Sequence, residues 1–403
     1  MGNGPLTGVK VLDMTQYESG TVCTESLAWM GAEVVKVERP VKGEASRHSN
    51  ADPVNDSYGF CILNMNKKSI TCNMKSPEGL ALIKELVKHS DVLVENLAPG
   101  AVDRLGLGYD VCKELNPKLI FASIKGFASD GPYANYPAFD PIASHTGCFV
   151  SATGLPEKPI KNAVNIADSG SGMACAMAIC AALYQRNVQG VGQKIEVAMQ
   201  DYMIGMARAL WESYYNTGKV PRRVGNGQPQ EDVAPSETYP CKPFGINDYV
   251  HIYCNRAPGS KDFTNLANAI GRPDLLEDER FATPHSRFVH KDALDPVIAE
   301  FCSKHTKQEV MDILAKAKVP AGAMLDVKDI SEDPQYTERG LMVEVTHYQR
   351  GKLKVPGFAP RMSENHIDYK SAPQLGNANE EIYHGVLGIS DDVLKQYKEK
   401  QII

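Results

Sequence analysis

The sequence lacks the spaced cysteines that zinc sites and redox motifs require. Its ten cysteines are scattered through 403 residues and form no Cys-x-x-Cys pair, so neither a zinc ribbon nor thioredoxin-like chemistry is expected. The ten histidines form no His-Glu-x-x-His motif, and we expect no metal site. Several cysteines lie in apolar runs such as FCILNM and AICAAL, where a reduced thiol behaves as a small hydrophobic group. Such thiols are typical of a reducing compartment, and we expect a cytoplasmic protein.

The chain also lacks an excess of positive charge. Lys and Arg number 43 against 49 Asp and Glu, a formal net charge of −6, whereas a nucleic-acid-binding protein needs a basic surface. The first residues, MGNGPLTGVKVLDMTQ, contain no basic region followed by an apolar one, so we expect no secretory signal. No uninterrupted run of about 18 apolar residues occurs, and we expect neither a membrane span nor a membrane partner.

Several sequence fingerprints of catalytic and nucleotide-binding sites are missing. The first predicted strand is followed by TQYESGTVC, whose single glycine cannot form the Gly-x-Gly-x-x-Gly pattern of NAD-binding folds, and no Walker A pattern occurs. The Gly-x-Ser-x-Gly motif of Ser-His-Asp hydrolases is absent as well. We therefore expect no NAD and no serine nucleophile.

What the sequence does contain is an alternation of strand and helix patterns in its amino-terminal third. The alternation predicts parallel βαβ units and an open, Rossmann-like sheet of the α/β class. In such sheets, sites lie at the carboxyl ends of the strands, which here fall at Thr15–Ser19, Arg39, Asn96 and Lys125–Phe127. The predicted strands are 9–14, 32–38, 91–96 and 119–127, and the predicted helices are 21–31 and 76–90, the latter with a Ser-Pro start.

The remaining sequence suggests a second domain, as the length of the chain also does. A small-residue helix is predicted over 169–185 and a long helix over 201–218, and 219–235 is a linker or active-site loop rich in Gly, Pro and charge. A strand and three helical patterns then predict a smaller α+β domain, and the tail returns to strands. We place the large domain at 1–225 and 326–403 and the small domain at 226–325.

Asp168 begins the small-residue stretch DSGSGMACAMAIC. From the local pattern it is most simply a helix N-cap, because Asp is among the best capping residues. The same place suits chemistry, since a helix N-terminus stabilises a carboxylate anion and a positioned carboxylate can be a covalent nucleophile. Gly170, Ser171 and Gly172 would leave room for a bulky substrate. The local sequence leaves both interpretations open.

Three basic residues follow predicted strands and are candidates for a phosphate-binding patch. They are Arg39, Lys75 and Arg104, and a guanidinium group suits phosphates because it can bond in bidentate fashion. Each of them alone is as well explained as a surface residue. The segment NMNKKSITCNMKS at 64–76 is similarly explained as a solvated turn with an edge strand.

Taken together, these segments resemble the class III CoA-transferases. The family includes enzymes that act on formyl-CoA with oxalate and on crotonobetainyl-CoA with carnitine. The resemblance implies a Rossmann-like domain built from both chain ends, a small inserted domain and an interlocked homodimer. The matching motifs are GPLTGVKVLDMTQ, GAEVVKVERP, NKKSITCNMKSPEG, VENLAPGAVDRLGLGY, NPKLIFASIKGF, AFDPIASHTG, ADSGSGM, GQKIEVAMQD, KVPGFAPRMS and the final KEKQII.

The resemblance also implies a reaction and its residues. Asp168 matches the family nucleophile, which attacks an acyl-CoA thioester, forms a mixed anhydride and then an aspartyl-CoA thioester, and passes CoA to a small carboxylic acid. Coenzyme A therefore enters as a substrate, and neither a metal nor NAD is needed. The matched CoA-binding positions are Glu18, Ser19, Arg39, Cys72, Asn73, Met74, Lys75, Asn96, Leu97, Ala98, Arg104, Tyr136, Pro137, Ala138 and Phe139, and the substrate positions are Asp140, Gly225, Asn226 and Gly227.

Three features differ from the family members that use formyl-CoA. Glu18 stands where they have Gln, and Gly59 stands where they have an active-site Tyr, with Tyr58 one place earlier. Their run of glycines before QP is reduced here to Gly225 and Gly227. We therefore expect acids other than formate and oxalate. A carboxylate at position 18 disfavours a dianionic acceptor, which favours a monoacid such as acetate or a larger organic acid.

Three alternatives remain beside the transferase. An α-methylacyl-CoA racemase of the same superfamily would need a His before Asp140, and Phe139, which stands there, cannot accept a proton. A CoA-binding paralogue without turnover is disfavoured because Asp168 is retained. An NAD-dependent oxidoreductase is suggested by the strand order alone and lacks the glycine fingerprint.

Overall fold

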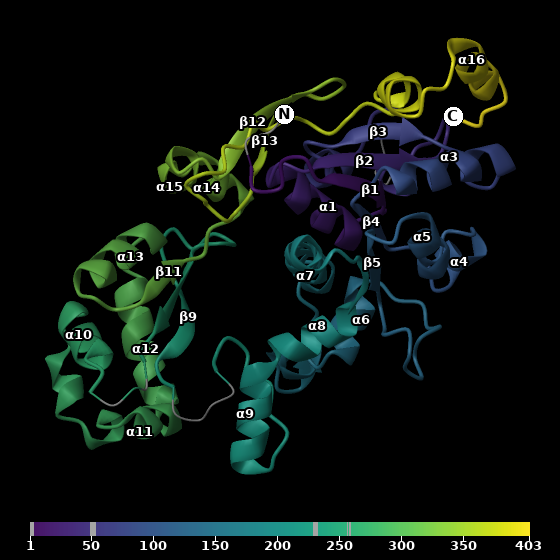
Figure 1. The fold of residues 1–403 in the computed structure, drawn as a ribbon. Helices are drawn as coiled ribbons and strands as arrows, with labels where there is room; N and C mark the ends of the chain where they lie inside the picture. The colour runs from purple at the N-terminus through teal and green to yellow at the C-terminus, as the bar shows by residue number, and fades with distance from the viewer. Residues whose placement is uncertain (1–3, 49–53, 229–232, 256, 258) are drawn as a thin grey trace. The chain divides into compact units, whose positions relative to one another are not determined.

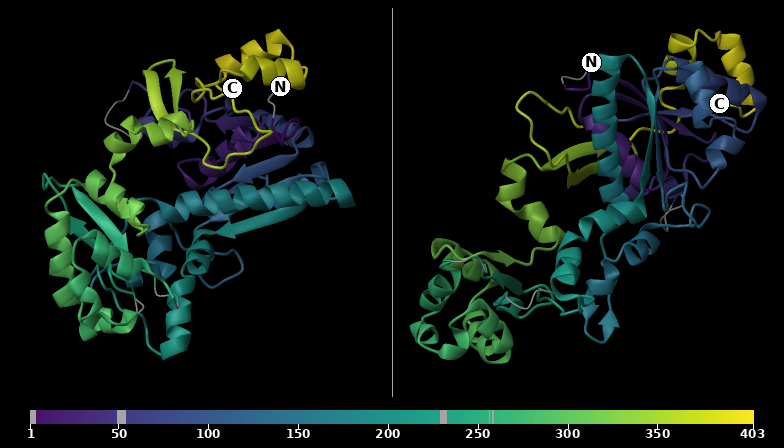
Figure 2. Two further views of the ribbon diagram at one scale, coloured as in Figure 1. Left: turned by 90° about the vertical axis from the view of Figure 1, so that its left-hand side faces the viewer. Right: turned by 60° about the horizontal axis from the view of Figure 1, so that its bottom comes forward.

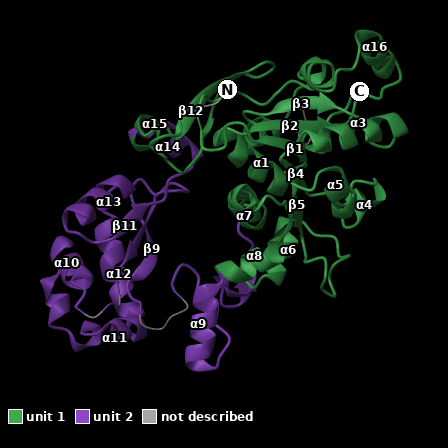
Figure 3. Ribbon diagram, in the orientation of Figure 1, with its two compact units in different colours: residues 1–149, 163–206, 335–403 green, residues 150–162, 207–334 purple. Residues whose placement is uncertain are grey.

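The computed structural model describes residues 4–48, 54–228, 233–255, 257 and 259–403. The chain forms two compact units (Figures 1 and 3). Unit 1 comprises residues 1–149, 163–206 and 335–403, and unit 2 comprises 150–162 and 207–334. Unit 1 is thus built from both ends of the chain. The predicted small domain, 226–325, lies inside unit 2, which is wider.

A six-stranded sheet organises unit 1, and all five of its strand pairings are parallel. The strand order is β3-β2-β1-β4-β5-β8. The order changes direction between β1 and β4, where a doubly wound sheet has its ligand crevice. This confirms the predicted Rossmann-like α/β fold. The strands are β1 (Lys10–Met14), β2 (Glu33–Glu38), β3 (Lys68–Thr71), β4 (Val92–Glu95), β5 (Ile120–Lys125) and β8 (Gln193–Ala198).

Helices cover both faces of this sheet, as its central strands, buried on both faces, require. In β1, Leu12 belongs to one core cluster and Val11 to the other, since successive side chains point to opposite faces. The Leu12 side is covered by α3 (Pro77–Lys88), α5 (Tyr109–Leu115) and α16 (Asp391–Glu399). The Val11 side is covered by α1 (Ser19–Trp29) and α7 (Ile166–Gln189), the long teal helix along the sheet in Figure 2.

Glycines in the first turns of α7 let other elements approach this helix closely. A Cβ atom at Gly172 would lie 2.3 Å from the carbonyl oxygen of Ser19 in α1, and one at Gly170 would lie 2.2 Å from the ring of Tyr202. Both glycines are therefore needed for packing between helices. The expectation that they leave room for a substrate is wrong.

Some predicted helices differ from those observed. The helix predicted over 201–218 is two helices, α8 (Met199–Met206) and α9 (Arg208–Thr217). Two helices that border the site, α2 (Tyr58–Leu63) and α6 (Asp140–Thr146), escape prediction because they are too short to show a helical period. The helix predicted from the Ser-Pro start is confirmed, with Ser76 Oγ accepting a hydrogen bond from the amide of Gly79.

The carboxyl-terminal part of unit 1 and the shorter elements complete the chain. The two strands predicted in the tail form an antiparallel hairpin, β12 (Met342–His347) and β13 (Gly351–Pro356). Other elements are α4 (Ala101–Arg104), β6 (Gly154–Leu155), β7 (Lys158–Pro159), α14 (Val327–Glu332), α15 (Pro334–Glu338), a π-helix at Glu380–Val386, and 3-10 helices at Ala45–His48, Val150–Ala152, Pro273–Leu276 and Glu279–Phe281.

Unit 2 is an α+β structure with its own core. Its three-stranded antiparallel sheet, in the order β11-β10-β9, packs against helices through buried residues that include Val250, Leu266, Ile298 and Leu314. The three helical patterns of the sequence are confirmed here. The elements are β9 (Ser236–Pro240), β10 (Tyr249–Tyr253), β11 (Ala321–Ala323), α10 (Asp262–Ala269), α11 (Pro284–Val289), α12 (Lys291–Cys302) and α13 (Lys307–Lys316).

One helix, α7, is long and apolar enough to span a membrane by length and composition alone. Half of its most apolar window is buried inside the protein, as in the core helices of globular domains. The length and apolar composition of α7 are therefore only weak evidence for a membrane-spanning helix.

Candidate active site

Asp168 lies in the first turn of α7 and is not the N-cap. The helix begins at Ile166, after Asn165, so Asp168 is its third residue and the capping prediction is wrong by three positions. The free amides of this turn are instead satisfied by Asp140. Its Oδ2 accepts hydrogen bonds from the backbone N–H groups of Ala167 (2.8 Å) and Asp168 (3.3 Å). The Asp168 side chain is thereby left available for chemistry.

A second carboxylate, that of Glu18, is fixed beside Asp168. Glu18 Oε2 accepts a hydrogen bond from Asn165 Nδ2, and Oε1 accepts one from Ser169 Oγ, both at 2.6 Å. These bonds join the loop after β1 to the residues that flank Asp168. Sequence reasoning missed both Asn165 and Ser169, because their only local signal is that they are polar residues close to Asp168.

The carboxyl groups around Asp168 change its ionisation. Burial, then the charge of Glu18 and then that of Asp140 raise the pKa of Asp168 from 3.8 to about 7. The sequence predicted the opposite, an anion stabilised by the helix end. That effect is outweighed by burial and by the charges of Glu18 and Asp140, and Asp140 already accepts from the helix amides. A carboxylate with a raised pKa is more basic, and perturbed groups of this kind cluster at functional sites.

Buried polar groups hold the loop between β1 and α1 that contains Glu18. Asp13 Oδ1 accepts from the amide of Thr15 (2.8 Å), and Lys36 Nζ donates to the Thr15 carbonyl (2.8 Å). Asn96, at the end of β4, accepts from the amide of Gln16 (2.9 Å) and donates to its carbonyl (2.8 Å). The loop therefore presents Glu18 in a fixed place at the switch point of the sheet.

Beneath this loop lies a buried ion cluster. Lys67 Nζ is 3.1 Å from Asp13 Oδ2, and both side chains are fully buried. Burial by itself would raise the pKa of Asp13, but Lys67 and Lys36 lower it to about 2. The prediction that 64–76 contains a solvated turn is thus wrong for Lys67. The prediction of an edge strand in the same segment is confirmed, because β3 is the edge strand of the sheet.

A pocket of about 290 Å³ opens over Asp168. At its side, the rings of Tyr17 and Phe139 meet edge to face, 6.3 Å between centroids, and both are substantially exposed. Tyr17 has a φ of 58°, which is uncommon for a residue other than glycine. The described residues that line the pocket include no lysine, arginine or histidine, and they are Tyr17, Glu18, Ser46, Gly59, Leu63, Phe139, Asp140, Pro141, Asn165 and Asp168.

The other predicted CoA-binding residues follow strand ends at the same edge of the sheet. Arg39 follows β2 and is exposed, as are Lys75 after β3 and Arg104 in α4. Cys72 is buried, and its thiol donates to the carbonyl of Gly79 at 3.3 Å. The amide of Asn73 donates to the carbonyl of Ile402. That these positions, with Ser19, Met74, Leu97 and Ala98, bind CoA stays a prediction.

The predicted segments 136–138 and 225–227 lie in different parts of the structure, the first in unit 1 and the second in unit 2. Tyr136 packs against Tyr133 (5.2 Å between centroids) in the loop after β5; the following Pro137 is exposed and Ala138 is half-buried. Gly225, Asn226 and Gly227 belong to unit 2, where the Gly225 amide donates to the carbonyl of Gly154 at 2.9 Å. Their assignment to the substrate site stays a prediction.

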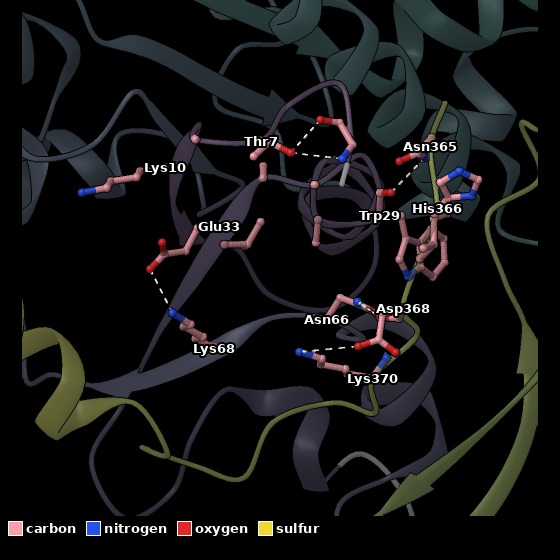
Figure 4. A pocket seen from close by; sticks show the side chains of 17 residues that line it. Thr7, Lys10, Trp29, Glu33, Asn66, Lys68, Asn365, His366, Asp368 and Lys370 are labelled. Atoms are coloured by element: carbon pink, nitrogen blue, oxygen red, sulfur yellow. Dashed lines mark hydrogen bonds and ion pairs between the residues drawn. The ribbon is translucent and has the colours of Figure 1, made fainter. Parts of the chain in front are cut away.

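A larger pocket, about 850 Å³, lies at the opposite end of the sheet. It is lined by Lys10, Glu33 and Lys68, the first residues of β1, β2 and β3 (Figure 4). Lys68 Nζ is 3.1 Å from Glu33 Oε1, and Asn66 donates to the carbonyl of Asp368 (2.7 Å). Because ligand sites of such sheets lie at the carboxyl ends of strands, the smaller pocket is the candidate active site. Across the described part of the chain, no group of three or more His, Cys, Asp or Glu suits a metal ion.

Comparisons with known proteins identify the family. The model of the family described as CoA-transferase family III matches residues 6–379. A protein named formyl-CoA:oxalate CoA-transferase from Streptomyces coelicolor is 38% identical, with 99% of each chain covered. One of the same name from Bradyrhizobium diazoefficiens is 37% identical, covering 96% of this chain and 94% of that protein. The crystal structure of a CaiB/BaiF family protein from Brucella suis has a TM-score of 0.83 at 31% identity, covering 95% of this chain and 100% of that one.

Proposed function

The chain belongs to CoA-transferase family III, and on this premise we propose that it transfers CoA from an acyl-CoA to a free carboxylic acid through covalent intermediates on Asp168. One observation supports the choice of nucleophile above all others. Asp168 lines a pocket at the carboxyl edge of the sheet. Its backbone N–H donates to Asp140, and the pKa of its carboxyl group is raised to about 7. Its carboxylate is therefore present at neutral pH and more basic than that of an ordinary Asp.

The proposed reaction has four exchanges. An Asp168 oxygen attacks the thioester carbonyl, the C–S bond breaks, and the CoA thiolate leaves an acyl–aspartyl anhydride. The thiolate attacks the aspartyl carbonyl and releases the first acid, which gives an aspartyl-CoA thioester. The acceptor carboxylate attacks that thioester, forming a new anhydride and freeing the thiolate. The thiolate then attacks the acyl carbonyl of the new anhydride, which yields the new acyl-CoA and restores Asp168.

Residues around Asp168 have positioning roles in this proposal. Glu18 is held by Asn165 and Ser169, and Asp140 orients the first turn of α7. One thioester is exchanged for another, so the overall free-energy change is small and no ATP is required. The main demand is that water be kept from the anhydride.

CoA is proposed to bind along the carboxyl edge, with Arg39, Lys75 and Arg104 near its phosphates. Support comes from their exposure and from their places after β2, after β3 and in α4. A homodimer is proposed as well. Its support is an exposed apolar stripe on α7, formed by Met173, Met177, Tyr184 and Val188, which an interface would bury. Free cysteines throughout favour a cytoplasmic location.

The acceptor is proposed to be a monocarboxylic acid. Relatives at 38% identity are named for formyl-CoA and oxalate. Here, however, a second substrate carboxylate would enter a pocket already lined by Glu18, Asp140 and Asp168. Like charges that share one small pocket repel each other strongly. Equal rates with oxalate and with monocarboxylates would contradict this part of the proposal.

Chemical trapping tests the nucleophile directly. The protein is incubated with acetyl-CoA and then hydroxylamine, and peptides are analysed by mass spectrometry. We expect a hydroxamate on Asp168 and a loss of transfer of at least about a thousandfold in Asp168→Asn. The matched control is Asp201→Asn, since Asp201 is the third residue of α8 and exposed. Full activity of Asp168→Asn would overturn the mechanism.

A further inference from the structure

One residue of the Asp168 pocket has no side chain although the fold does not require a glycine there. Gly59 is the second residue of α2 and lines the pocket. A Cβ atom at this position would have Ser57 Oγ, at 3.6 Å, as its nearest neighbour, which is ordinary contact. At Gly170 and Gly172, by contrast, a Cβ atom would collide with neighbours at 2.2 and 2.3 Å. Gly59 also does not have a positive φ. Glycine here leaves space in the pocket.

The rest of the pocket divides into charged and apolar parts. Glu18, Asp140 and Asp168 supply negative charge, and Tyr17, Leu63 and Phe139 supply apolar surface. The pocket's 290 Å³ corresponds to roughly ten water volumes at about 30 Å³ each, much more than a formyl group occupies. The walls thus suit an apolar tail and disfavour a second anion.

We propose that Gly59 determines the length of the acid that is transferred. The space at Gly59, in the pocket that Leu63 and Phe139 also line, receives the apolar tail of a monocarboxylic acid while its carboxyl carbon is joined to Asp168. This rests on the proposed function and adds the substrate class: straight-chain acids longer than acetate. Both the acyl donor and the acceptor acid occupy this space in turn, because each is bonded to Asp168 during the cycle.

The proposal predicts a dependence on chain length. Each methylene that is removed from water raises kcat/KM about fourfold, so kcat/KM increases from acetate to butanoate to hexanoate until the pocket is full. Because the tail contributes binding away from the reacting carbon, the gain is expected mainly in KM.

The test measures transfer from acetyl-CoA to isotopically labelled acetate, whose exchange is followed by mass spectrometry, and to butanoate, hexanoate and oxalate. Three proteins are compared: the wild type, Gly59→Leu and the matched control Gly205→Leu. Gly205 lies in α8, is exposed and has open space around its Cβ position. We expect the ratio of kcat/KM with hexanoate to kcat/KM with acetate to fall tenfold or more in Gly59→Leu, mostly through the KM for hexanoate. Gly205→Leu should match the wild type. Gly59→Ala, with an intermediate effect, covers the case in which Leu impairs folding.

The outcomes separate this inference from the function on which it rests. If the wild type transfers CoA but Gly59→Leu and Gly59→Ala leave the length profile unchanged, the inference is overturned and the function stands. A wild-type preference for oxalate over every monocarboxylate also overturns the inference. Absence of both transfer and Asp168 labelling with all four acids overturns the function itself.

Discussion

Asp13 is fully buried and Asp168 is half-buried, both at the carboxyl edge of one sheet, yet their pKa values move in opposite directions. Asp13 lies against Lys67 and Lys36, and its pKa falls to about 2. Asp168 lies against Glu18 and Asp140, and its pKa rises to about 7. Burial is common to the two, so the sign of the neighbouring charges decides the difference. The first arrangement holds the loop in place, and the second makes Asp168 more basic, as its proposed role as a nucleophile requires.

Removing the cation beside Asp13 should have the largest effect on stability. Lys67→Met leaves Asp13 without its closest positive partner, and breaking a buried pair in this way costs about 3–5 kcal/mol. The free energy of unfolding from urea titration measures it.

The matched control for this change is the next residue, Lys68→Met. Lys68 forms ion pairs with Glu33 and Glu381, but its side chain is about one-third exposed. Exposed pairs contribute about 0–1 kcal/mol. Equal losses for the two variants would show that burial of the Asp13 pair does not matter, contrary to the comparison above.

Removing a charge beside Asp168 should shift the pH dependence of transfer. The group must be ionised to attack, so kcat/KM of the wild type should rise with pH through a midpoint near 7. Two neighbouring carboxylates raise the pKa of Asp168, and Glu18→Gln removes the one with the larger effect. The midpoint should therefore move to lower pH, by about one unit, a factor of roughly ten in ionised enzyme on the acid side.

A pH profile of kcat/KM from pH 5 to 9 checks this expectation. Gln still accepts a hydrogen bond through its side-chain oxygen, so the contact with Ser169 or Asn165 can persist. An upward movement of the midpoint, or none, would contradict the electrostatic role of Glu18. The control is Glu85→Gln, an exposed residue paired with Lys88 on α3, which should leave the profile unchanged.

The sequence predicted the fold well, because the elements of the sheet have regular patterns. Long helices such as α3 and the strands of unit 1 were found within a few residues, since their apolar periodicity is local. Short helices such as α2 were missed, because six residues do not establish a period. The family match also followed from motifs in the sequence.

The environment of Asp168 was not predictable in the same way. The start of α7 depends on Asp140, 28 residues before Asp168, and the raised pKa depends on Glu18, on a different loop. Similarly, the Lys-Lys pair at 67–68 looks uniformly solvated, but one lysine is buried against Asp13 and the other is partly exposed. Such differences are set by contacts between distant segments, which single-sequence patterns do not contain.

The smallest effect on the pH profile is expected from substitutions of Asp140. Two such substitutions distinguish its role as a hydrogen-bond acceptor for the helix amides from the effect of its charge. Asp140→Asn keeps an oxygen that can accept from the Ala167 and Asp168 amides, so the unfolding free energy should change by less than about 1 kcal/mol. It also removes the carboxylate with the smaller effect on the pKa of Asp168. The midpoint of the pH profile of kcat/KM should therefore move to lower pH by less than in Glu18→Gln. Asp140→Ala, which removes both the acceptor and the charge, should show the same midpoint and an additional loss of stability of about 0.5–2 kcal/mol. A larger midpoint shift in Asp140→Asn than in Glu18→Gln would reverse the ranking of the two carboxylates and make Asp140, rather than Glu18, the main reason why Asp168 differs from Asp13.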